Sequence, residues 1–509
     1  MAIVEPAGSG GSGRRRLRLR NPATLEPLDE FEVETEEDVR AAVERARKAQ
    51  PEWAALKISE RGRILCRAIP HLIDRQEELV DAIVRETGKP KPEALAEVMG
   101  ACDALQFYAK RAPKFLSDRT LAMHLLRNKK LRIAYRPLGV VGIITPWNFP
   151  FMLAFNPTVQ ALVAGNAVVL KPSEVTPFSG LLVREVLRSA RIPDDLFQVV
   201  LGDGTTGAAL VEAGVQKICF TGSVRTGRRV GEACGRNLVP FTLELGGKDP
   251  MIVCADADLE RAANGAVYGA FSNSGQVCVS TERVYVVDSV ADEFTQKVVE
   301  KTAALRQGDG GEFEIGPMIW PAQLEIVERH VEEAKARGAK VLTGGRRNPS
   351  FSGLFYEPTV LVDVDHEMAV MREETFGPVL PIMRVRDEEE ALRLANDTRY
   401  GLNANVWTRD RRKGERLARA VQSGSAVIND CMLTYGATES PFGGVKESGI
   451  GQVNGETGLR SFCHAQSIIV DRFGAKSEFL WYPYSAKKLA WLRRAMRWVW
   501  GTPLGRWLS

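Results

Sequence analysis

The sequence predicts an α/β fold with a parallel, doubly wound sheet, followed by a second α/β domain. From residue 140 onward, apolar runs of strand length alternate with helical patterns: Val140–Ile144, a helix near 157–164, Ala167–Leu170, a helix near 177–189 and Phe197–Leu201. This alternation favours strands that pair in parallel through crossover helices. The 509 residues suffice for two or three domains with a large core.

The segments before residue 140 differ in character. Residues 7–13 are rich in glycine and serine, and five arginines follow at 14, 15, 16, 18 and 20. We therefore predict a flexible leader over residues 1–19, whose arginines form a solvated basic arm. Residues 36–110 have apolar positions at helical spacing, and residues 119–136 predict a β-hairpin.

A second α/β block extends from about residue 247 to 445. Its strand-like apolar runs are Pro250–Val253, Arg283–Val287, Ala339–Thr343, Val379–Arg384 and Ala426–Asn429. No internal repeat is visible in the sequence.

Composition narrows the class of protein. Hydrophobic residues make up 44% of the chain and charged residues 26%, which is ordinary for a soluble globular protein. The eight cysteines show no CxxC pair and no zinc-like spacing. We therefore expect reduced thiols, no disulfide and no metal site. No N-terminal apolar stretch resembles a signal peptide, so a cytoplasmic location is expected.

Two short segments carry residues suited to acyl chemistry. Cys278 ends the segment Ser-Gly-Gln-Val-Cys, and Glu244 precedes Leu-Gly-Gly-Lys, thirty-four residues earlier. A thiolate can attack a carbonyl, and a carboxylate can activate the water that hydrolyses the acyl-enzyme. Either segment alone is weak evidence, because a lone cysteine is more often a small buried hydrophobe.

Two further segments follow predicted strands. Thr145–Pro150 has a proline on each side of Trp147 and Asn148, which predicts a rigid, extended turn. An amide held there can donate to an oxyanion without reorganising; the alternative is an ordinary turn with a packed tryptophan. Lys171 and Glu174 lie just past another strand, at the edge where α/β sheets bind ligands.

Together these segments resemble the motifs of the aldehyde dehydrogenase superfamily. The similarity covers about residues 20 to 472, and six motifs occur in family order: Thr145–Pro150, Lys171–Glu174, Phe220–Ser223, Glu244–Lys248, Gly275–Cys278 and Glu373–Pro378. Pro441–Gly449 is similar to the closing segment of the family. The resemblance implies a Rossmann-type cofactor domain, an α/β catalytic domain and a small β arm for assembly into a homodimer or homotetramer. The expected boundaries are 20–118 and 137–246 for the cofactor domain, 247–445 for the catalytic domain, and 119–136 and 459–472 for the arm.

The resemblance also implies the roles of individual residues. Cys278 would attack the aldehyde, the side chain of Asn148 and the N–H of Cys278 would stabilise the oxyanion, and Glu244 would activate the hydrolytic water. The cofactor-binding residues would be Trp147, Lys171, Glu174, Gly204, Gly222, Ser223, Gly227, Glu374 and Phe376.

The identity of the cofactor depends on a few of these positions. Gly202–Gly207 matches GxGxxG, but a lone match is weak, and the resemblance places it only near the adenosine. The pyrophosphate is expected instead at Gly222, Ser223 and the helix start that follows. Glu174 would repel a 2′-phosphate, so NAD is favoured. Lys171 tempers this preference for NAD over NADP.

The substrate is less clear from sequence. Members that act on semialdehydes of small dicarboxylates often have an arginine eight residues after the asparagine equivalent to Asn148, and here position 156 is asparagine. Phe151 and Phe155, with Val277 and Val279 beside the nucleophile, predict an apolar site for an aliphatic or aromatic aldehyde. The alternative is that the two phenylalanines only pack a helix.

Three other functions stay open at this point. The first is succinate-semialdehyde dehydrogenase, and the second is transfer of the acyl group to coenzyme A, against which Glu244 argues. The third is a non-catalytic structural or binding relative, which should have lost Cys278 or Glu244.

Residues 475–509 depart from the family pattern. They hold seven lysines or arginines, one acidic residue and five of the nine tryptophans. Without them, 61 basic and 63 acidic residues remain, so the net charge of +4 becomes −2. We predict that residues 485–505 form a basic amphipathic helix that contacts an anionic membrane surface without spanning it. Docking on the protein body or on another subunit is the alternative, and nucleic acid is not expected as a partner.

Overall fold

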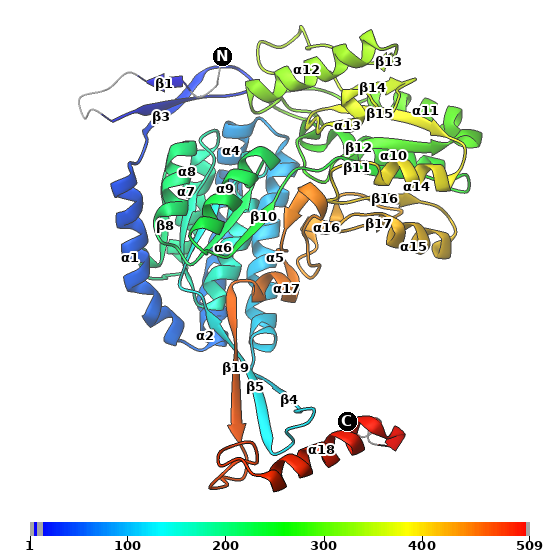
Figure 1. Cartoon of the computed structure of the whole chain (residues 1–509). Coiled ribbons are helices and arrows are strands. Elements are labelled where there is room, and N and C mark those ends of the chain that lie inside the picture. Colours follow the sequence, from blue (N-terminus) through cyan, green and yellow to red (C-terminus); the bar gives the residue numbers. More distant parts are fainter. Residues whose placement is uncertain (1–4, 8–13, 505–509) are drawn as a thin grey trace. The chain divides into compact units, whose positions relative to one another are not determined.

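The computed structural model describes residues 5–7 and 14–504, and it divides into two compact units (Figure 1). The first unit comprises Met1–Phe115 and Pro137–Phe462, and the second comprises Leu116–Arg136 and Cys463–Ser509. The first unit contains two large sheets, each with helices on both faces.

The first large sheet has six strands in the order β18-β10-β9-β6-β7-β8. Its strands are β6 (Val140–Ile144), β7 (Ala167–Lys171), β8 (Phe197–Val199), β9 (Lys217–Thr221), β10 (Phe241–Glu244) and β18 (Gly449–Ile450). All pairings are parallel except that of β18 with β10. The chain extends outward from β6 in both directions, which confirms the predicted doubly wound sheet.

The helices of this half explain why its strands are apolar throughout. They are α6 (Met152–Ala164), α7 (Pro177–Ser189), α8 (Gly204–Glu212) and α9 (Val224–Arg236). Every residue of β6 and β7 is buried, as expected for strands covered on both faces. Helix α6 is itself buried from Leu153 to Ala164, so it is a central helix rather than an amphipathic surface helix.

The second large sheet has seven strands in the order β13-β14-β15-β12-β11-β16-β17. They are β11 (Asp249–Val253), β12 (Thr281–Val287), β13 (Lys340–Thr343), β14 (Thr359–Val362), β15 (Val379–Val385), β16 (Asn405–Trp407) and β17 (Val427–Ile428). The helices that follow β10 in this unit are α10 (Leu259–Phe271), α11 (Asp288–Ala303), α12 (Pro321–Ala336), α13 (Ala369–Arg372), α14 (Glu388–Asn396), α15 (Arg411–Ala420), α16 (Leu433–Gly436) and α17 (Gly455–Arg460). Each predicted apolar run of this block lies at one of these strands.

Five helices precede the first sheet: α1 (Glu36–Ala55), α2 (Ile58–Leu65), α3 (Ile69–Asp74), α4 (Gln76–Thr87) and α5 (Lys91–Phe115). Helix α4 ends at Gly88, whose φ of 68° is left-handed, and a Cβ there would lie 2.4 Å from Pro317. Glycine is therefore required at this turn. The turn brings Lys89 into the interior just before α5 begins.

The predicted flexible leader is wrong for residues 16–19. Strands β1 (Glu5–Ala7), β2 (Arg16–Arg20) and β3 (Pro27–Glu32) form a small antiparallel sheet. Leu17 and Leu19 are buried, and Arg16 pairs with Glu30 and Glu32. Residues 8–13 of the predicted leader lie outside the described residues.

The second unit holds the predicted β arm and the C-terminal segment. Its sheet has the order β19-β5-β4, from β4 (Arg119–Leu121), β5 (Lys129–Pro137) and β19 (Cys463–Asp471), and α18 (Ala486–Gly501) follows (Figure 1). Strands β4 and β5 form the predicted hairpin. The expected start of the second arm segment at 459 falls in α17, which belongs to the first unit.

Candidate active site

The loop that carries Cys278 has an unusual backbone. It follows α10, and Asn273, Ser274 and Gly275 have φ values of 48°, 56° and 73°, all in the left-handed region. A Cβ on Gly275 would lie 2.1 Å from the carbonyl oxygen of Gly377, so only glycine fits there. The Ser274 hydroxyl donates to the Gly316 carbonyl at 2.8 Å. Such strained non-glycine residues persist only where neighbours hold them, and they cluster at functional sites.

Asn148 lies on the turn after β6 and is hydrogen-bonded directly to the loop that carries Cys278. Its Nδ2 donates to the Gln276 carbonyl at 2.9 Å, and the Asn273 Nδ2 donates to the Asn148 carbonyl at 2.9 Å. The structure therefore brings the two predicted segments together. An amide NH₂ has two hydrogens, so one remains for a substrate oxygen.

Glu244 is the last residue of β10, and the Gly-Gly turn after it closes on Cys278. A Cβ on Gly247 would lie 2.6 Å from the Cys278 carbonyl oxygen. Both carboxyl oxygens of Glu244 are buried with no hydrogen-bond partner among the described residues. Burial raises the pKa of Glu244 well above its usual range.

The thiol of Cys278 is held in its neutral form. Burial raises its pKa most, and the nearby acidic groups of Asp249, Glu244 and Glu374, when ionised, raise it further. Because the thiolate is the nucleophile, this environment keeps the unliganded thiol unreactive near neutral pH.

Three predicted cofactor residues meet beside this centre. Glu374 Oε1 accepts a hydrogen bond from the Gly247 N–H at 3.1 Å, and burial raises the pKa of Glu374 to about 8. The rings of Trp147 and Phe376 lie 5.5 Å apart, edge to face. The sequence could place each residue on a loop, but only the fold shows that the loop of Trp147 meets the loop of Glu374 and Phe376.

The remaining predicted cofactor residues lie at or just beyond strand ends of the first sheet. Lys171 ends β7 and its Nζ lies 3.0 Å from Glu174 Oε2, so this carboxylate is paired. Ser223 caps α9, and its Oγ accepts from the Thr226 N–H. A Cβ on Gly227 would lie 2.5 Å from Leu245, which makes glycine there a packing requirement, whereas Gly204 faces open space.

This donor set fits a dinucleotide. The capped N-terminus of a 13-residue helix beyond Gly222 suits a pyrophosphate, and the Lys171–Glu174 pair suits a ribose. A Cβ on Gly246 would lie 2.1 Å from the Glu374 carboxylate, so glycine lets that side chain reach the site.

Sequence reasoning missed the residues that hold the two catalytic loops. Glu93 and Glu97 lie one turn apart at the start of α5. Glu93 Oε1 accepts from the Asn273 N–H at 2.8 Å and from the Ser272 hydroxyl at 2.9 Å. Glu97 Oε2 accepts from the N–H groups of residues 151 and 152 at 3.1 and 3.0 Å. One helix therefore holds, by hydrogen bonds, both the loop that carries Cys278 and the turn that carries Asn148.

Lys89 contacts both Glu97 and the Asn148 turn. Its Nζ lies 2.7 Å from Glu97 Oε1 and 2.7 Å from the Asn148 carbonyl oxygen, and the side chains of the ion pair are fully buried. We call Lys89, Glu93 and Glu97 the α5 clamp. The i, i+4 spacing of the two glutamates was visible in the sequence, but it is equally typical of a solvated helix face.

The comparisons with known proteins agree with this architecture. The model of the aldehyde dehydrogenase family matches residues 9–468, most of the chain. The chain belongs to the aldehyde dehydrogenase family. It is an aldehyde dehydrogenase of the α/β fold predicted from sequence, and this family uses NAD or NADP.

Individual relatives differ in their named substrates. The "4,4'-diapolycopene aldehyde oxidase" of Methylomonas sp is 42% identical over 472 residues, covering 91% of this chain and 88% of that protein. A "putative succinate-semialdehyde dehydrogenase [NADP(+)] 2" of Mycobacterium ulcerans is 41% identical, covering 88% and 87%. The solved NAD-dependent aldehyde dehydrogenase of Sinorhizobium meliloti is 35% identical with a TM-score of 0.88, covering 93% of this chain and 94% of that one.

On the substrate side, one prediction for this aldehyde dehydrogenase fails. Phe151 and Phe155 are fully buried and stack with ring centroids 5.4 Å apart, so they pack the interior around α6. The alternative stated from sequence is therefore the correct one. Asn156 is also buried, and its Oδ1 has no hydrogen-bond partner among the described residues. Arg283 is fully buried and donates to three backbone carbonyls, those of residues 248, 394 and 395.

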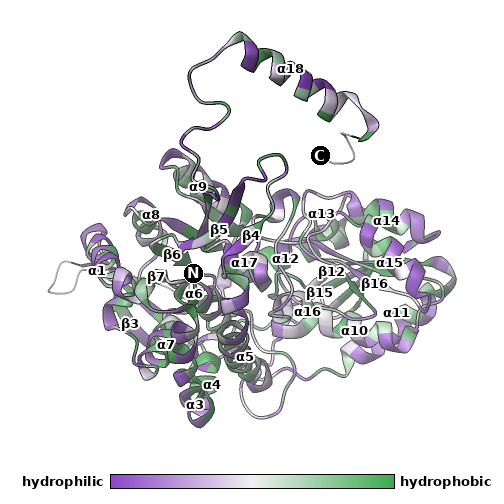
Figure 2. Cartoon of the chain, turned by 90° about the horizontal axis from the view of Figure 1, so that it is seen from below, coloured by the Kyte–Doolittle hydropathy of each residue, from purple (hydrophilic) through white to green (hydrophobic). Residues whose placement is uncertain are grey.

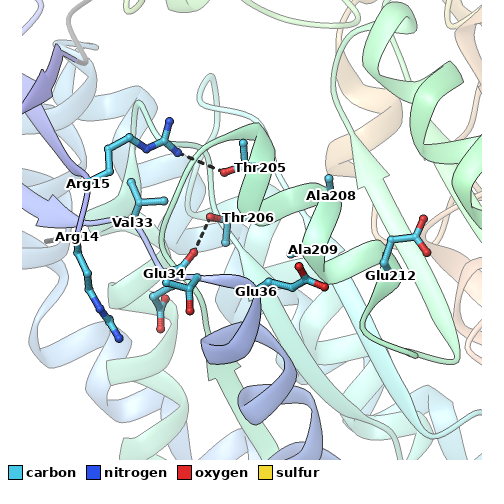
Figure 3. Close-up of a pocket in the computed structure, with 11 residues that line it drawn as sticks. Arg14, Arg15, Val33, Glu34, Glu36, Thr205, Thr206, Ala208, Ala209 and Glu212 are labelled. Carbon is cyan, nitrogen blue, oxygen red and sulfur yellow. Dashed lines mark hydrogen bonds between the residues drawn. The ribbon is translucent and has the colours of Figure 1, made fainter.

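A pocket of about 620 Å³ lies apart from the predicted site residues. It is bordered by the N-terminal arginines, the start of α1 and one side of α8 (Figure 3). Arg15 donates to the Thr205 hydroxyl at 3.2 Å, and the Thr206 hydroxyl donates to the Glu34 carbonyl at 3.1 Å. No residue of the predicted catalytic or cofactor sets lines it.

One group of side chains has the composition of a metal site. Among the described residues, Cys254, Asp256 and Glu388 bring three ligand atoms together. The ammonium of Lys413 lies 3.1 Å from Asp256 and 2.9 Å from Glu388, so a protein cation already neutralises the pair. This cluster carries no functional argument.

Proposed function

We propose that this enzyme oxidises hydrophobic aldehydes to carboxylic acids with NAD as the hydride acceptor. The supporting observation is the junction around Cys278, where the Asn148 amide is bonded to the nucleophile loop and Glu244 keeps both carboxyl oxygens free of protein partners. A thioester route needs an oxyanion donor and a base in these two positions.

The chain's own groups would act in sequence. Cys278 Sγ loses its proton to solvent and bonds to the aldehyde carbon, while the carbonyl oxygen becomes an oxyanion held by the Asn148 Nδ2–H and the Cys278 N–H. When bound, the dinucleotide supplies the acceptor for the hydride, and Cys278 then carries a thioester. Glu244 takes a proton from water, whose oxygen attacks the thioester carbon; the carbon–sulfur bond breaks, the proton on Glu244 returns to the leaving Cys278 thiolate, and the acid leaves. Glu244 must lose its own proton first, because burial favours the neutral carboxyl.

The substrate class rests on two observations. Position 156 carries a neutral amide where a dicarboxylate semialdehyde would need a cation. The relative from Methylomonas is named for the aldehyde of a hydrocarbon, 4,4'-diapolycopene. The mycobacterial relatives named for succinate semialdehyde support the second candidate function, so the two substrates must be compared directly.

Steady-state kinetics with straight-chain aldehydes of rising length, alongside succinic semialdehyde, tests the substrate class. We expect kcat/KM to rise by about fourfold per added methylene, since burial of each is worth ~0.8 kcal/mol. A kcat/KM for succinic semialdehyde above that of every straight-chain aldehyde would overturn the proposal and establish the second candidate.

The preference for NAD rests on Glu174. Its carboxylate would accept from ribose hydroxyls and repel a 2′-phosphate, although the ion pair with Lys171 weakens that repulsion. The ratio of kcat/KM for NAD to that for NADP measures the preference, and a ratio below one would contradict it.

Assembly and location complete the proposal. The arm leaves the nine-residue strand β19 at a sheet edge with mostly exposed side chains, and such an edge favours pairing with a second copy. We propose a homodimer or homotetramer. Light scattering on the protein as it elutes from a sizing column would measure the mass of the oligomer. We also propose a cytoplasmic location, in peripheral contact with a membrane where hydrophobic aldehydes partition. Among the described residues no helix is long and apolar enough to cross a bilayer.

A further inference from the structure

The C-terminal helix α18 is a folded element that the rest of its own unit leaves uncovered. Ser485 caps it, and its Oγ accepts from the Lys488 N–H at 3.1 Å. None of its sixteen residues is buried. A helix of this length gains most of its stability from packing an apolar face, so the missing cover indicates a partner.

The helix is nevertheless joined firmly to the arm by the segment before it. The Arg472 N–H donates to the Asn128 carbonyl at 3.1 Å, and Lys129 forms ion pairs with Asp471 and Glu478. The Phe479 ring packs on Trp491 with centroids 4.5 Å apart. Helix α18 and the segment before it are thus held at a defined place on the second unit.

Many side chains of α18 and of the segments on either side of it are large, apolar and exposed. Those at least 50% exposed are Leu480, Trp481, Tyr482, Tyr484, Leu489, Trp491, Met496, Trp498, Trp500 and Leu504. Figure 2 shows hydrophobic and hydrophilic residues interspersed along α18. A concentration of exposed large apolar side chains in one segment, with polar groups among them, is typical of a protein or membrane contact.

The distribution of charge decides between those partners. Helix α18 has five basic residues, Lys487, Lys488, Arg493, Arg494 and Arg497, and no acidic residue. At 100° per residue, Leu489, Leu492 and Met496 share one face, Lys487 and Arg494 lie opposite, and Arg497 lies to the side. Trp491 and Trp498 fall toward the basic side, whereas Trp500 borders the apolar face, where an indole ring suits the headgroup level of a bilayer. Lysine and arginine can extend from the same helix to lipid phosphates.

We propose that α18 and the aromatic segment Phe479–Tyr484 bind the surface of an anionic lipid bilayer. The inference rests on the peripheral membrane contact proposed above and names its surface and its lipid class. Leu489, Leu492 and Met496 enter the acyl boundary, and the basic residues contact anionic headgroups. Binding is reversible and weakens with salt, because each basic residue near the surface strengthens binding about fivefold.

Sedimentation of the full-length enzyme with vesicles tests the proposal. We expect the wild type to sediment with phosphatidylcholine vesicles that contain 30 mol% phosphatidylglycerol, and to remain in the supernatant with phosphatidylcholine alone. Arg494→Gln with Arg497→Gln should weaken partitioning about 25-fold, from two factors of about five. The matched control is Arg411→Gln with Arg412→Gln, two exposed arginines on α15, which should sediment like the wild type.

A second pair of variants tests the apolar face. Leu492→Ser with Met496→Ser should also abolish sedimentation, whereas serine at the exposed Ile73 and Leu238 should not. Turnover of a short, water-soluble aldehyde by every variant should equal that of the wild type, which shows that the fold is intact.

Two results would overturn the proposal. The first is equal sedimentation of the wild type and both α18 variants. The other is a change in oligomer mass in the α18 variants, which would make this surface a contact between subunits. A wild type that prefers succinic semialdehyde would instead refute the substrate proposal and leave the sedimentation result unaffected.

Discussion

Replacing Lys89 by methionine tests whether the α5 clamp sets the position of Asn148. Methionine keeps most of the length of the side chain but removes the ammonium that lies 2.7 Å from both Glu97 and the Asn148 carbonyl. Glu97 then keeps only its backbone donors within a fully buried site. Breaking one partner of a buried ion pair costs about 3–5 kcal/mol, so the midpoint of thermal unfolding should fall by several degrees.

The effect on turnover follows from the oxyanion donor. Complete loss of such a donor costs about 10²–10³ in kcat, and a displacement of about 1 Å costs up to about 10². Lys89→Met leaves Asn148 present but less firmly held, so we expect kcat/KM to fall by about ten- to a hundredfold. The dissociation constant for NAD should change by less than about twofold, because the clamp does not touch Lys171 or Glu174.

Lys413→Met is the matched control, because Lys413 is another ion-paired lysine, held by Asp256 and Glu388, that lies outside the catalytic loops. It should lower the unfolding midpoint and leave kcat/KM unchanged. If Lys89→Met folds and keeps wild-type kcat/KM, the clamp does not position Asn148.

Four further predictions concern the site itself. Cys278→Ala should abolish turnover while NAD binding, measured by calorimetry, stays near normal; residual turnover above about one per cent of wild type would exclude Cys278 as the nucleophile. Glu244→Gln should permit one rapid hydride transfer and then stall, giving a burst of NADH in stopped flow; steady turnover without a burst would exclude Glu244 as the hydrolytic base. Glu174→Ser should raise the ratio of NADP to NAD efficiency about tenfold, and an unchanged ratio would mean that Glu174 does not face the ribose. Because burial and the carboxylates of Asp249, Glu244 and Glu374 raise the pKa of Cys278, alkylation of this thiol by iodoacetamide without cofactor should be slow at pH 7 and accelerate through pH 9. A rate already on its plateau at pH 7 would contradict that pKa shift, and Cys278→Ala identifies the labelled residue.

The sequence predicted the sheets because buried parallel strands have a simple pattern. Val140–Ile144 and Ala167–Leu170 are apolar at every position, since both faces of their sheet are covered. The N-terminal strand was missed although Arg16–Arg20 alternates strictly between arginine and leucine. Its charge favoured a solvated arm, while the period of two, which places Leu17 and Leu19 inward, is the pattern of a strand.

The candidate site was predictable only one loop at a time. Asn148 and Cys278 are confined by adjacent prolines and glycines, which leave traces in the sequence. The α5 clamp leaves no such distinctive trace, because Lys89, Glu93 and Glu97 resemble ordinary surface residues until the fold turns them inward. The same limit affected Phe151 and Phe155, since an apolar residue beside a catalytic turn packs the core as readily as it lines a substrate site.

The bonds that join the catalytic loops connect residues very far apart in the chain. Asn148 and Gln276 are separated by 128 positions, Gly247 and Glu374 by 127, and Glu93 and Asn273 by 180. Loop closure over such distances is slow, so the site is expected to assemble after the helices and sheets that support it. It should also be lost first on mild denaturation, with activity disappearing at urea concentrations where the helical circular dichroism is still intact. Catalytic competence in this enzyme is therefore the last property gained on refolding, and aldehyde turnover reports complete assembly more sensitively than any spectrum of secondary structure.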